Sequence, residues 1–68
     1  MSTDIVFGIE RMKWIRVRLG ESQQEFAERI GVDSNMISRY ETGHAKPTQA
    51  RVLKALLDAE RAAEEAAV

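Results

Sequence analysis

Apolar residues recur at helical spacing along this chain, and the same spacing occurs twice between residues 23 and 42. The apolar positions are Phe26, Ala27 and Ile30 in the first stretch, and Met36, Ile37 and Tyr40 in the second. Residues at i, i+1 and i+4 fall on one face of a helix, so each stretch has an apolar side and a polar side. We therefore predict two short amphipathic helices, over residues 23–30 and 34–42.

Capping residues mark the ends of these two helices. Ser22 followed three residues later by Glu25 is a capping box, in which each side chain binds the backbone N–H of the other residue. Gly31 can adopt the left-handed conformation that ends a helix, and Asp33 can cap the helix that follows. Helices joined by so short a turn pack together only by crossing steeply. The sequence therefore predicts a helix-turn-helix.

Two further helices flank this pair. The first is predicted from Ile9 to Leu19, with Met12 and Ile15 facing the core together with Leu19. The second begins near Thr48, just after a proline. Its apolar side consists of Val52, Leu53, Leu56 and Leu57. The predicted fold is all-α, and its core includes Phe26, Ile30, Val32, Ile37, Leu53 and Leu56.

Composition divides the chain into three segments. Residues 1–8 are predicted to form an N-terminal arm, residues 9–57 the helical domain, and residues 58–68 a C-terminal tail. The tail, DAERAAEEAAV, has high helix propensity but almost no large apolar side chains. We expect it to extend the last helix, to fray and to bury little.

The chain has 68 residues, of which 44% are hydrophobic and 31% charged, which suits one helical domain. A core of this size gives marginal stability, so self-association is favoured. With no cysteine and one histidine, the sequence predicts no disulfide, no metal or cofactor site and no catalytic site, and hence no enzyme. Without a recognisable leader or membrane span, we expect a cytoplasmic protein.

The net charge of −1 argues by itself against a nucleic-acid partner, because neutralising phosphates drives most non-specific binding. The distribution of charge along the chain, in contrast, favours a nucleic-acid partner. Residues 11–54 carry nine Lys/Arg and five Asp/Glu, whereas both ends of the chain are acidic. We expect a polarised surface with weak non-specific affinity for DNA.

Residues 9–57 resemble the Cro and C1 type of helix-turn-helix, also called the Xre family. The residues that carry the resemblance are Arg16, Leu19-Gly20, Ser22-Gln23, Phe26-Ala27, Ile30-Gly31-Val32, Ile37-Ser38-Arg39-Tyr40-Glu41, Gly43 and Pro47. It implies a lambda-repressor-like compact bundle of four, or with the tail five, short helices, and double-stranded DNA as partner. Glu21 departs from the family, which usually has an apolar residue there. The fifth helix of phage repressors is also missing, which leaves the means of dimerisation open.

The polar side of the helix over residues 34–42 carries the candidate base-reading residues, because such a helix enters the major groove with its N-terminal half facing the bases. These are Ser34, Asn35, Ser38 and Arg39. Arg39 can donate two hydrogen bonds to guanine, Asn35 can pair with adenine, and the serines suit several bases. The alternative is that all four are merely solvated.

Candidate phosphate-binding residues lie on either side of that helix. Gln23 opens the preceding helix, where backbone N–H groups attract a phosphate oxygen, and it could also brace Ser34. For Thr42, His44 and Lys46, the family resemblance implies a second phosphate contact. His44 is otherwise expected to be an exposed loop residue.

Four more residues have structural expectations. The resemblance implies a partly buried ion pair between Arg16 and Glu41, which we assign to architecture. Trp14 and Val17 share a face of the first helix away from its core stripe. They could pack on the arm through Phe7, pack on the C-terminal helix, or form a patch for dimerisation.

The resemblance favours a sequence-specific transcriptional regulator, a Cro-like dimeric repressor that reads a palindromic operator and occludes a promoter. Its setting would be the bacterial nucleoid, or the host cytoplasm if a phage encodes it. The alternative is the antitoxin of a toxin–antitoxin pair, which binds its own operon and a toxin partner. Residues 47–57 look like some antitoxins of the host-inhibition type.

Overall fold

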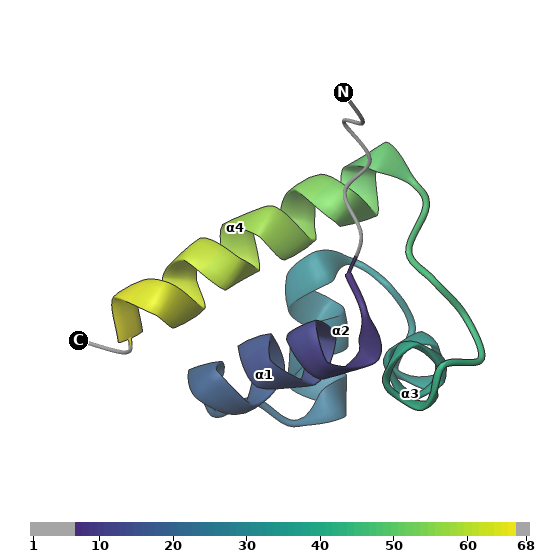
Figure 1. Cartoon of the computed structure of the whole chain (residues 1–68), viewed down its shortest axis with the longest axis horizontal. Helices are drawn as coiled ribbons and strands as arrows, with labels where there is room; N and C mark the ends of the chain where they lie inside the picture. The colour runs from purple at the N-terminus through teal and green to yellow at the C-terminus, as the bar shows by residue number, and fades with distance from the viewer. Residues whose placement is uncertain (1–6, 67–68) are drawn as a thin grey trace.

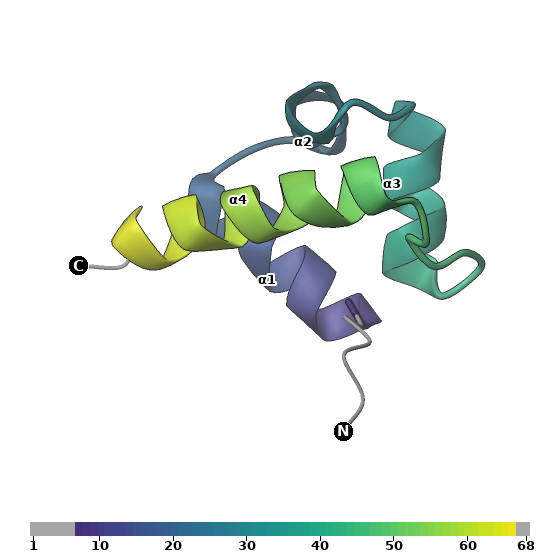
Figure 2. The same ribbon diagram turned by 90° about the horizontal axis from the view of Figure 1, so that it is seen from above.

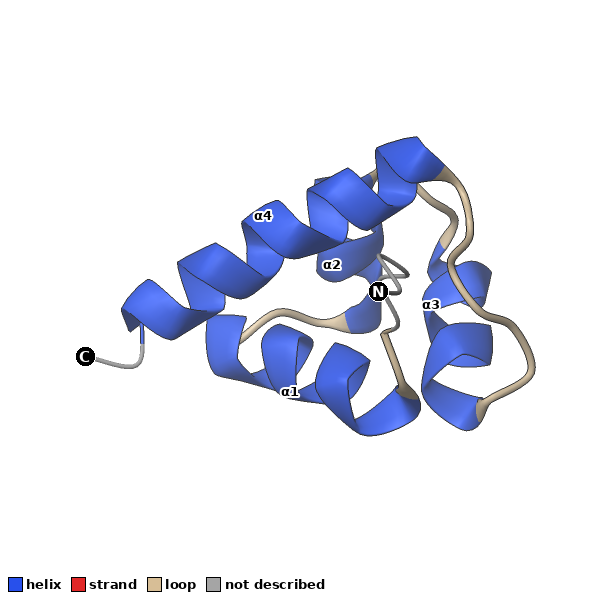
Figure 3. Ribbon diagram, turned by 45° about the horizontal axis from the view of Figure 1, so that its top comes forward, coloured by secondary structure: helices blue, strands red, loops and turns tan. Residues whose placement is uncertain are grey.

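The helix boundaries follow the capping chemistry of the sequence closely. In the computed structural model, which describes residues 7–66, the chain forms helices and loops with no strand in that range (Figure 1, Figure 3). The helices are α1 (Ile9–Leu19), α2 (Gln23–Ile30), α3 (Ser34–Thr42) and α4 (Ala50–Ala66). The all-α fold predicted from the sequence is therefore confirmed.

The capping box at the start of α2 is present in full. The Ser22 hydroxyl accepts from the Glu25 backbone N–H at 3.1 Å, and the Glu25 carboxylate accepts from the Ser22 N–H at 2.9 Å. At the other end, Gly31 has φ +77°, in the left-handed region where a side chain would be strained. Asp33 then caps α3 by accepting from the Asn35 N–H at 2.8 Å. The turn of the helix-turn-helix is thus built from local bonds, as predicted.

Helix α4 begins two residues later than the sequence suggested. The expected start near Thr48 is wrong, because the helix begins at Ala50. Its first turn is closed by the Leu53 N–H, which donates to the Gln49 carbonyl at 2.9 Å. Pro47 is buried against the domain, and two non-helical residues separate it from α4. The proline therefore anchors the preceding loop instead of standing just before the helix.

The core lies where the four helices meet. Of the six predicted core residues, Phe26, Ile30, Ile37 and Leu56 are buried, while Val32 and Leu53 are partly buried against them. Phe7, just before α1, also belongs to the core and is 4% exposed. The Arg11 guanidinium lies 4.2 Å from the centre of its ring, in a cation–π contact.

The C-terminal tail contributes more buried side chains to the core than expected. Helix α4 continues without a break to Ala66 and runs across α1 and α2 (Figure 2). Within it, Ala59 is 2% exposed and Ala63 is fully buried. The expectation that this segment buries little is wrong, because methyl side chains allow neighbouring helices to approach closely. An ion pair between Arg11 and Glu60, with Nε 2.7 Å from Oε2, joins α1 to the same segment.

Trp14 and Val17 are not covered by the described part of the chain. Trp14 is 45% exposed and Val17 is 59% exposed. Phe7 packs into the core and Ala63 of α4 is already buried, so neither of the two intramolecular covers is seen within residues 7–66. The rest of the predicted arm, residues 1–6, and the last two residues of the tail lie outside the described residues.

Candidate nucleic-acid interface

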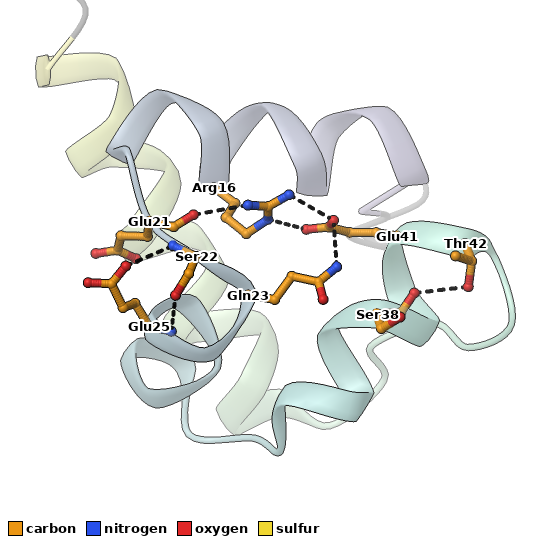
Figure 4. A network of polar contacts seen from close by, with 8 residues as sticks. All are labelled: Arg16, Glu21, Ser22, Gln23, Glu25, Ser38, Glu41 and Thr42. Carbon is orange, nitrogen blue, oxygen red and sulfur yellow. Dashed lines mark hydrogen bonds and ion pairs between the residues drawn. The ribbon is translucent and has the colours of Figure 1, made fainter.

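A polar network ties the helix-turn-helix to α1 (Figure 4). Arg16 of α1 and Glu41 near the end of α3 form the expected ion pair, with Nε 2.6 Å from Oε2 and Nη2 3.1 Å from Oε1. The two side chains are only 17% and 7% exposed. The hydrogen bond from Arg16 to Glu41 raises the pKa of the guanidinium above its ordinary value. Arg16 also donates to the carbonyl of Glu21 at 3.0 Å, which ties it to the corner between α1 and α2.

Gln23, a predicted phosphate-binding residue, belongs to this same network. Its side-chain amide donates to Glu41 Oε1 at 3.3 Å. Among the described residues no hydrogen bond joins Gln23 to Ser34, and the amide nitrogen is directed to Glu41 (Figure 4). Gln23 is half-buried at the first position of α2. The network therefore holds the start of α2 in a fixed position relative to the end of α3.

Glu21, the residue that departs from the family pattern, forms an ion pair with Arg29. Its carboxylate lies 2.6 Å from Nη2 of Arg29, and Arg29 Nε donates to both of its oxygens. The hydrogen bond from Arg29 to Glu21 raises the pKa of that arginine. An ion pair between Glu21 and Arg29 therefore holds the corner between α1 and α2.

The polar side of α3 faces away from the core. Ile37 and Tyr40 are buried, whereas Asn35 and Arg39 are exposed. Ser34 and Ser38 are half-buried. Within residues 7–66, the side chains of Asn35 and Arg39 make no hydrogen bond or ion pair. Their donors and acceptors are therefore available to a ligand at this surface.

The loop after α3 is shaped by its own backbone bonds. Gly43 has φ +83°, and the His44 N–H donates to the Arg39 carbonyl at 2.9 Å. The Thr42 hydroxyl lies 2.9 Å from the Ser38 carbonyl and 2.7 Å from Nδ1 of His44. The side chain of Thr42 thus has internal partners on both sides. Lys46 follows in the same loop with an exposed side chain.

Arg51 is a neighbour of this surface that sequence reasoning did not single out. From the first turn of α4, its Nη1 donates to the carbonyl of Gly31 in the turn at 3.3 Å. A Cβ on Gly31 would lie 2.7 Å from that nitrogen. The only signal in the sequence was a basic residue early in a helix, which by itself indicates nothing about the turn.

Ion pairs also change how positive charge is distributed over the surface. The pairs of Arg11, Arg16 and Arg29 with carboxylates cancel much of the positive charge of α1 and α2. Arg39 and Lys46, in contrast, remain exposed in α3 and the loop that follows it. Arg39 and Lys46 thus place positive charge beside the polar face of α3.

A comparison with known protein families identifies the family of this chain. A helix-turn-helix family profile matches residues 12–57, which is most of the chain and includes most of α1, all of α2 and α3, and the first part of α4. The chain belongs to the Cro/C1-type helix-turn-helix family. No curated protein and no solved structure gives a match. As a member of this family, the helix-turn-helix protein is a DNA-binding regulator. Within residues 7–66, no helix is long and apolar enough to cross a membrane.

Proposed function

We propose that this helix-turn-helix protein is a transcriptional repressor that binds a palindromic operator as a dimer, with α3 in the major groove. The observation that carries the proposal is the polar face of α3 in a chain of this family, where the side chains of Asn35 and Arg39 bind no other residue of the described range 7–66. Asn35 and Arg39 are exposed on α3, while Ile37 and Tyr40 hold its other side in the core. A rigid helix with free base-reading groups is what major-groove recognition requires.

Each side chain on this face has a proposed partner. Arg39 donates two hydrogen bonds to O6 and N7 of a guanine, and Asn35 pairs with N6 and N7 of an adenine. Ser34 and Ser38 are half-buried at the same face and donate to or accept from several bases. Arg39 thus supplies the strongest preference for one base pair.

Phosphate contacts flank this face on both sides. Gln23 lies at the N-terminus of α2, where the helix dipole and free N–H groups favour an anion. Lys46 supplies an exposed positive charge from the loop after α3. His44 Nδ1 lies 2.7 Å from the Thr42 hydroxyl, which leaves Nε2 as the ring nitrogen for a phosphate. A phosphate at Thr42 itself must compete with the Ser38 carbonyl for the hydroxyl hydrogen, so its contact is the weakest of the four.

The short length of the recognition helix α3 is the reason for proposing a dimer. Helix α3 has nine residues and reaches only a few base pairs. Two copies related by a two-fold axis place two such helices one helical turn apart, about 34–36 Å, so the operator is palindromic. Bound at a promoter, a dimer of this kind excludes the polymerase and represses transcription.

Selection of bound sites from random duplexes tests the proposal. We expect one enriched palindrome, and sedimentation of the protein with that duplex should give two chains per duplex. A duplex with one half-site scrambled is the control and should bind much more weakly. Enrichment of no sequence, or a strict one-to-one complex on asymmetric DNA, would refute the proposal.

A further inference from the structure

Two glycines flank α3, and each is contacted by a side chain from outside the helix-turn-helix. Gly31 precedes α3 with φ +77°, and Gly43 follows it with φ +83°. A Cβ on Gly31 would lie 2.7 Å from Nη1 of Arg51, and one on Gly43 would lie 2.9 Å from Cδ1 of Ile9. Arg51 belongs to the first turn of α4, and Ile9 is the first residue of α1. Both ends of α3 are therefore in contact with a helix that lies outside the α2–α3 pair.

The contact at the start of α3 includes a hydrogen bond. Nη1 of Arg51 donates to the Gly31 carbonyl at 3.3 Å. This carbonyl lies at the C-terminal end of α2, where carbonyl groups without a helical partner and the negative end of the helix dipole attract a basic side chain. Ser34, the first residue of α3, follows closely in the sequence. Arg51 therefore ties α4 to the turn from which α3 begins.

The contact at the end of α3 is apolar. Ile9 is 46% exposed, so most of its role is not in the core. Its terminal methyl group lies against the backbone of Gly43, where any side chain would displace it. The loop that begins at Gly43 carries His44 and Lys46, two of the proposed phosphate-binding residues. Ile9 therefore ties α1 to the point where α3 ends and this loop begins.

We propose that Arg51 and Ile9 are positioning residues for base reading, which fix the two ends of α3 and do not themselves bind DNA. The proposal rests on the proposed function, because it concerns how Asn35 and Arg39 reach the bases. Hydrogen bonds to base edges need side chains held within about 0.5 Å of the productive geometry. Phosphate contacts depend mainly on charge and tolerate more displacement. Loss of either positioning residue should therefore reduce sequence preference more than non-specific binding.

NMR of the free protein tests the two contacts without DNA. A nuclear Overhauser effect should join the Cδ1 methyl protons of Ile9 to the α-protons of Gly43. Residual dipolar couplings of backbone N–H groups report the orientation of α3 relative to α2. They should change for α3 in the variant Ile9→Ala/Arg51→Met. The matched control is Lys54→Met/Leu57→Ala, which removes one exposed basic and one exposed apolar side chain of α4, and its couplings should equal those of the wild type.

Anisotropy titrations on matched and mismatched duplexes test the role in reading. The ratio of the two dissociation constants, mismatched over matched, should fall by about threefold to tenfold in Arg51→Met and in Ile9→Ala. The control variants Lys54→Met and Leu57→Ala should keep the wild-type ratio. Ile9→Leu, which keeps an apolar side chain of the same size, should recover most of the loss. Circular dichroism melts of every variant ensure that a lower ratio is not a loss of fold.

The salt dependence distinguishes positioning from a phosphate contact. A residue that acts through α3 neutralises no phosphate, so Arg51→Met should keep the wild-type slope of affinity against salt concentration. A slope reduced by about one unit per protomer would make Arg51 a phosphate-binding residue and overturn its positioning role.

Two further results would overturn the proposal. One is a double variant Ile9→Ala/Arg51→Met whose α3 couplings equal those of the wild type, and the other is a wild-type ratio of dissociation constants in both single variants. Failure of the proposed function gives a different result. In that case the wild-type chain prefers no duplex, which removes the role in base reading, while the dipolar couplings of the free protein still show whether the two side chains fix α3.

Discussion

Glu41 at the end of α3 receives two hydrogen bonds from the Arg16 guanidinium, at 2.6 and 3.1 Å. The same carboxylate accepts the amide of Gln23 at 3.3 Å. One side chain therefore connects three helices: α1, which carries Arg16, α2, which begins at Gln23, and α3, which carries the proposed base-reading residues. Because the pair is mostly shielded from water, it should matter for stability more than a surface ion pair does.

Arg16→Met should destabilise the domain, because it leaves the Glu41 carboxylate buried without its cation. Removal of one partner of a buried pair costs about 3–5 kcal/mol, and some access of Arg16 to water reduces this to about 2–3 kcal/mol. Urea denaturation followed by circular dichroism measures the loss. Arg29→Met, which breaks the more exposed pair with Glu21, is the comparison and should cost about 1 kcal/mol or less.

The double variant Arg16→Met/Glu41→Leu should recover much of the stability lost by Arg16→Met, because no buried charge is left unpaired. The two single variants and the double variant form a thermodynamic cycle. A double variant as unstable as the sum of the single ones would mean that the pair does not couple, against the observed geometry.

Acid should remove stability supplied by Glu25 and Glu60. Hydrogen bonds from the Ser22 backbone N–H and then the Ser22 hydroxyl lower the pKa of Glu25, and the hydrogen bond from Arg11 lowers that of Glu60. A carboxyl whose pKa is lower in the folded state stabilises the fold fully above its unfolded pKa, near 4.5. That stabilisation is lost as the pH falls through the lower folded value.

Denaturation curves from neutral pH to about pH 3 measure this dependence. Glu60→Gln should flatten the acid limb of the stability profile, since the glutamine does not titrate. Glu25→Gln should do so with little loss at neutral pH, because glutamine also completes a capping box. Glu65→Gln, an exposed site on α4, controls for removal of a surface charge. An acid limb unchanged in both test variants would contradict the prediction.

Ala63→Leu should destabilise the contact between α1 and α4. Ala63 is fully buried, and added methylene groups in a packed site cost about 1–3 kcal/mol. The melting temperature should fall by about 4–8 °C for each kcal/mol in a domain of this size. Ala66→Leu, one turn further on at an exposed position, should melt close to wild type. Equal melting temperatures for the two variants would show that the end of α4 is not packed in solution.

Arg39→Ala and Lys46→Ala should impair DNA binding in different ways. Loss of a bidentate guanine contact should cost about 1–3 kcal/mol on the preferred operator and relax the preference at one base pair in each half-site. Lys46→Ala should weaken all sequences alike and reduce the salt slope by about one unit per protomer, because one fewer counterion is released. Anisotropy titrations on matched and mismatched duplexes at several salt concentrations measure both effects. Wild-type binding by both variants would show that DNA uses another face.

Local rules predicted the bounds of the first three helices. The capping box of Ser22 and Glu25 spans three residues, and the left-handed glycines at positions 31 and 43 act on the turn that precedes them. Interactions of this range depend on neighbours in the sequence, so they can be seen without knowing the fold. The i, i+1, i+4 spacing on α2 and α3 likewise identified Phe26 and Ile37 as core residues.

The polar partners over longer range could not be predicted in the same way. Gln23 and Glu41 are separated by 18 positions, and Arg11 and Glu60 by 49. Many charged pairs in the sequence are equally plausible at such distances, and only the crossing of the helices selects among them. The pair of Arg16 and Glu41 was expected because the family resemblance supplied the tertiary information that spacing lacks.

By itself, the sequence determined the helices, their caps and the polar face of α3, because periodicity and capping act within one or two helical turns. Only the tertiary structure determined that Ala59 and Ala63 are buried. An alanine has little preference between core and solvent, and its burial depends on whether another helix approaches. It also decided that Trp14 is exposed among the described residues. The spacing along α1 places Trp14 away from the core stripe, but spacing within one helix does not show whether another segment covers that side.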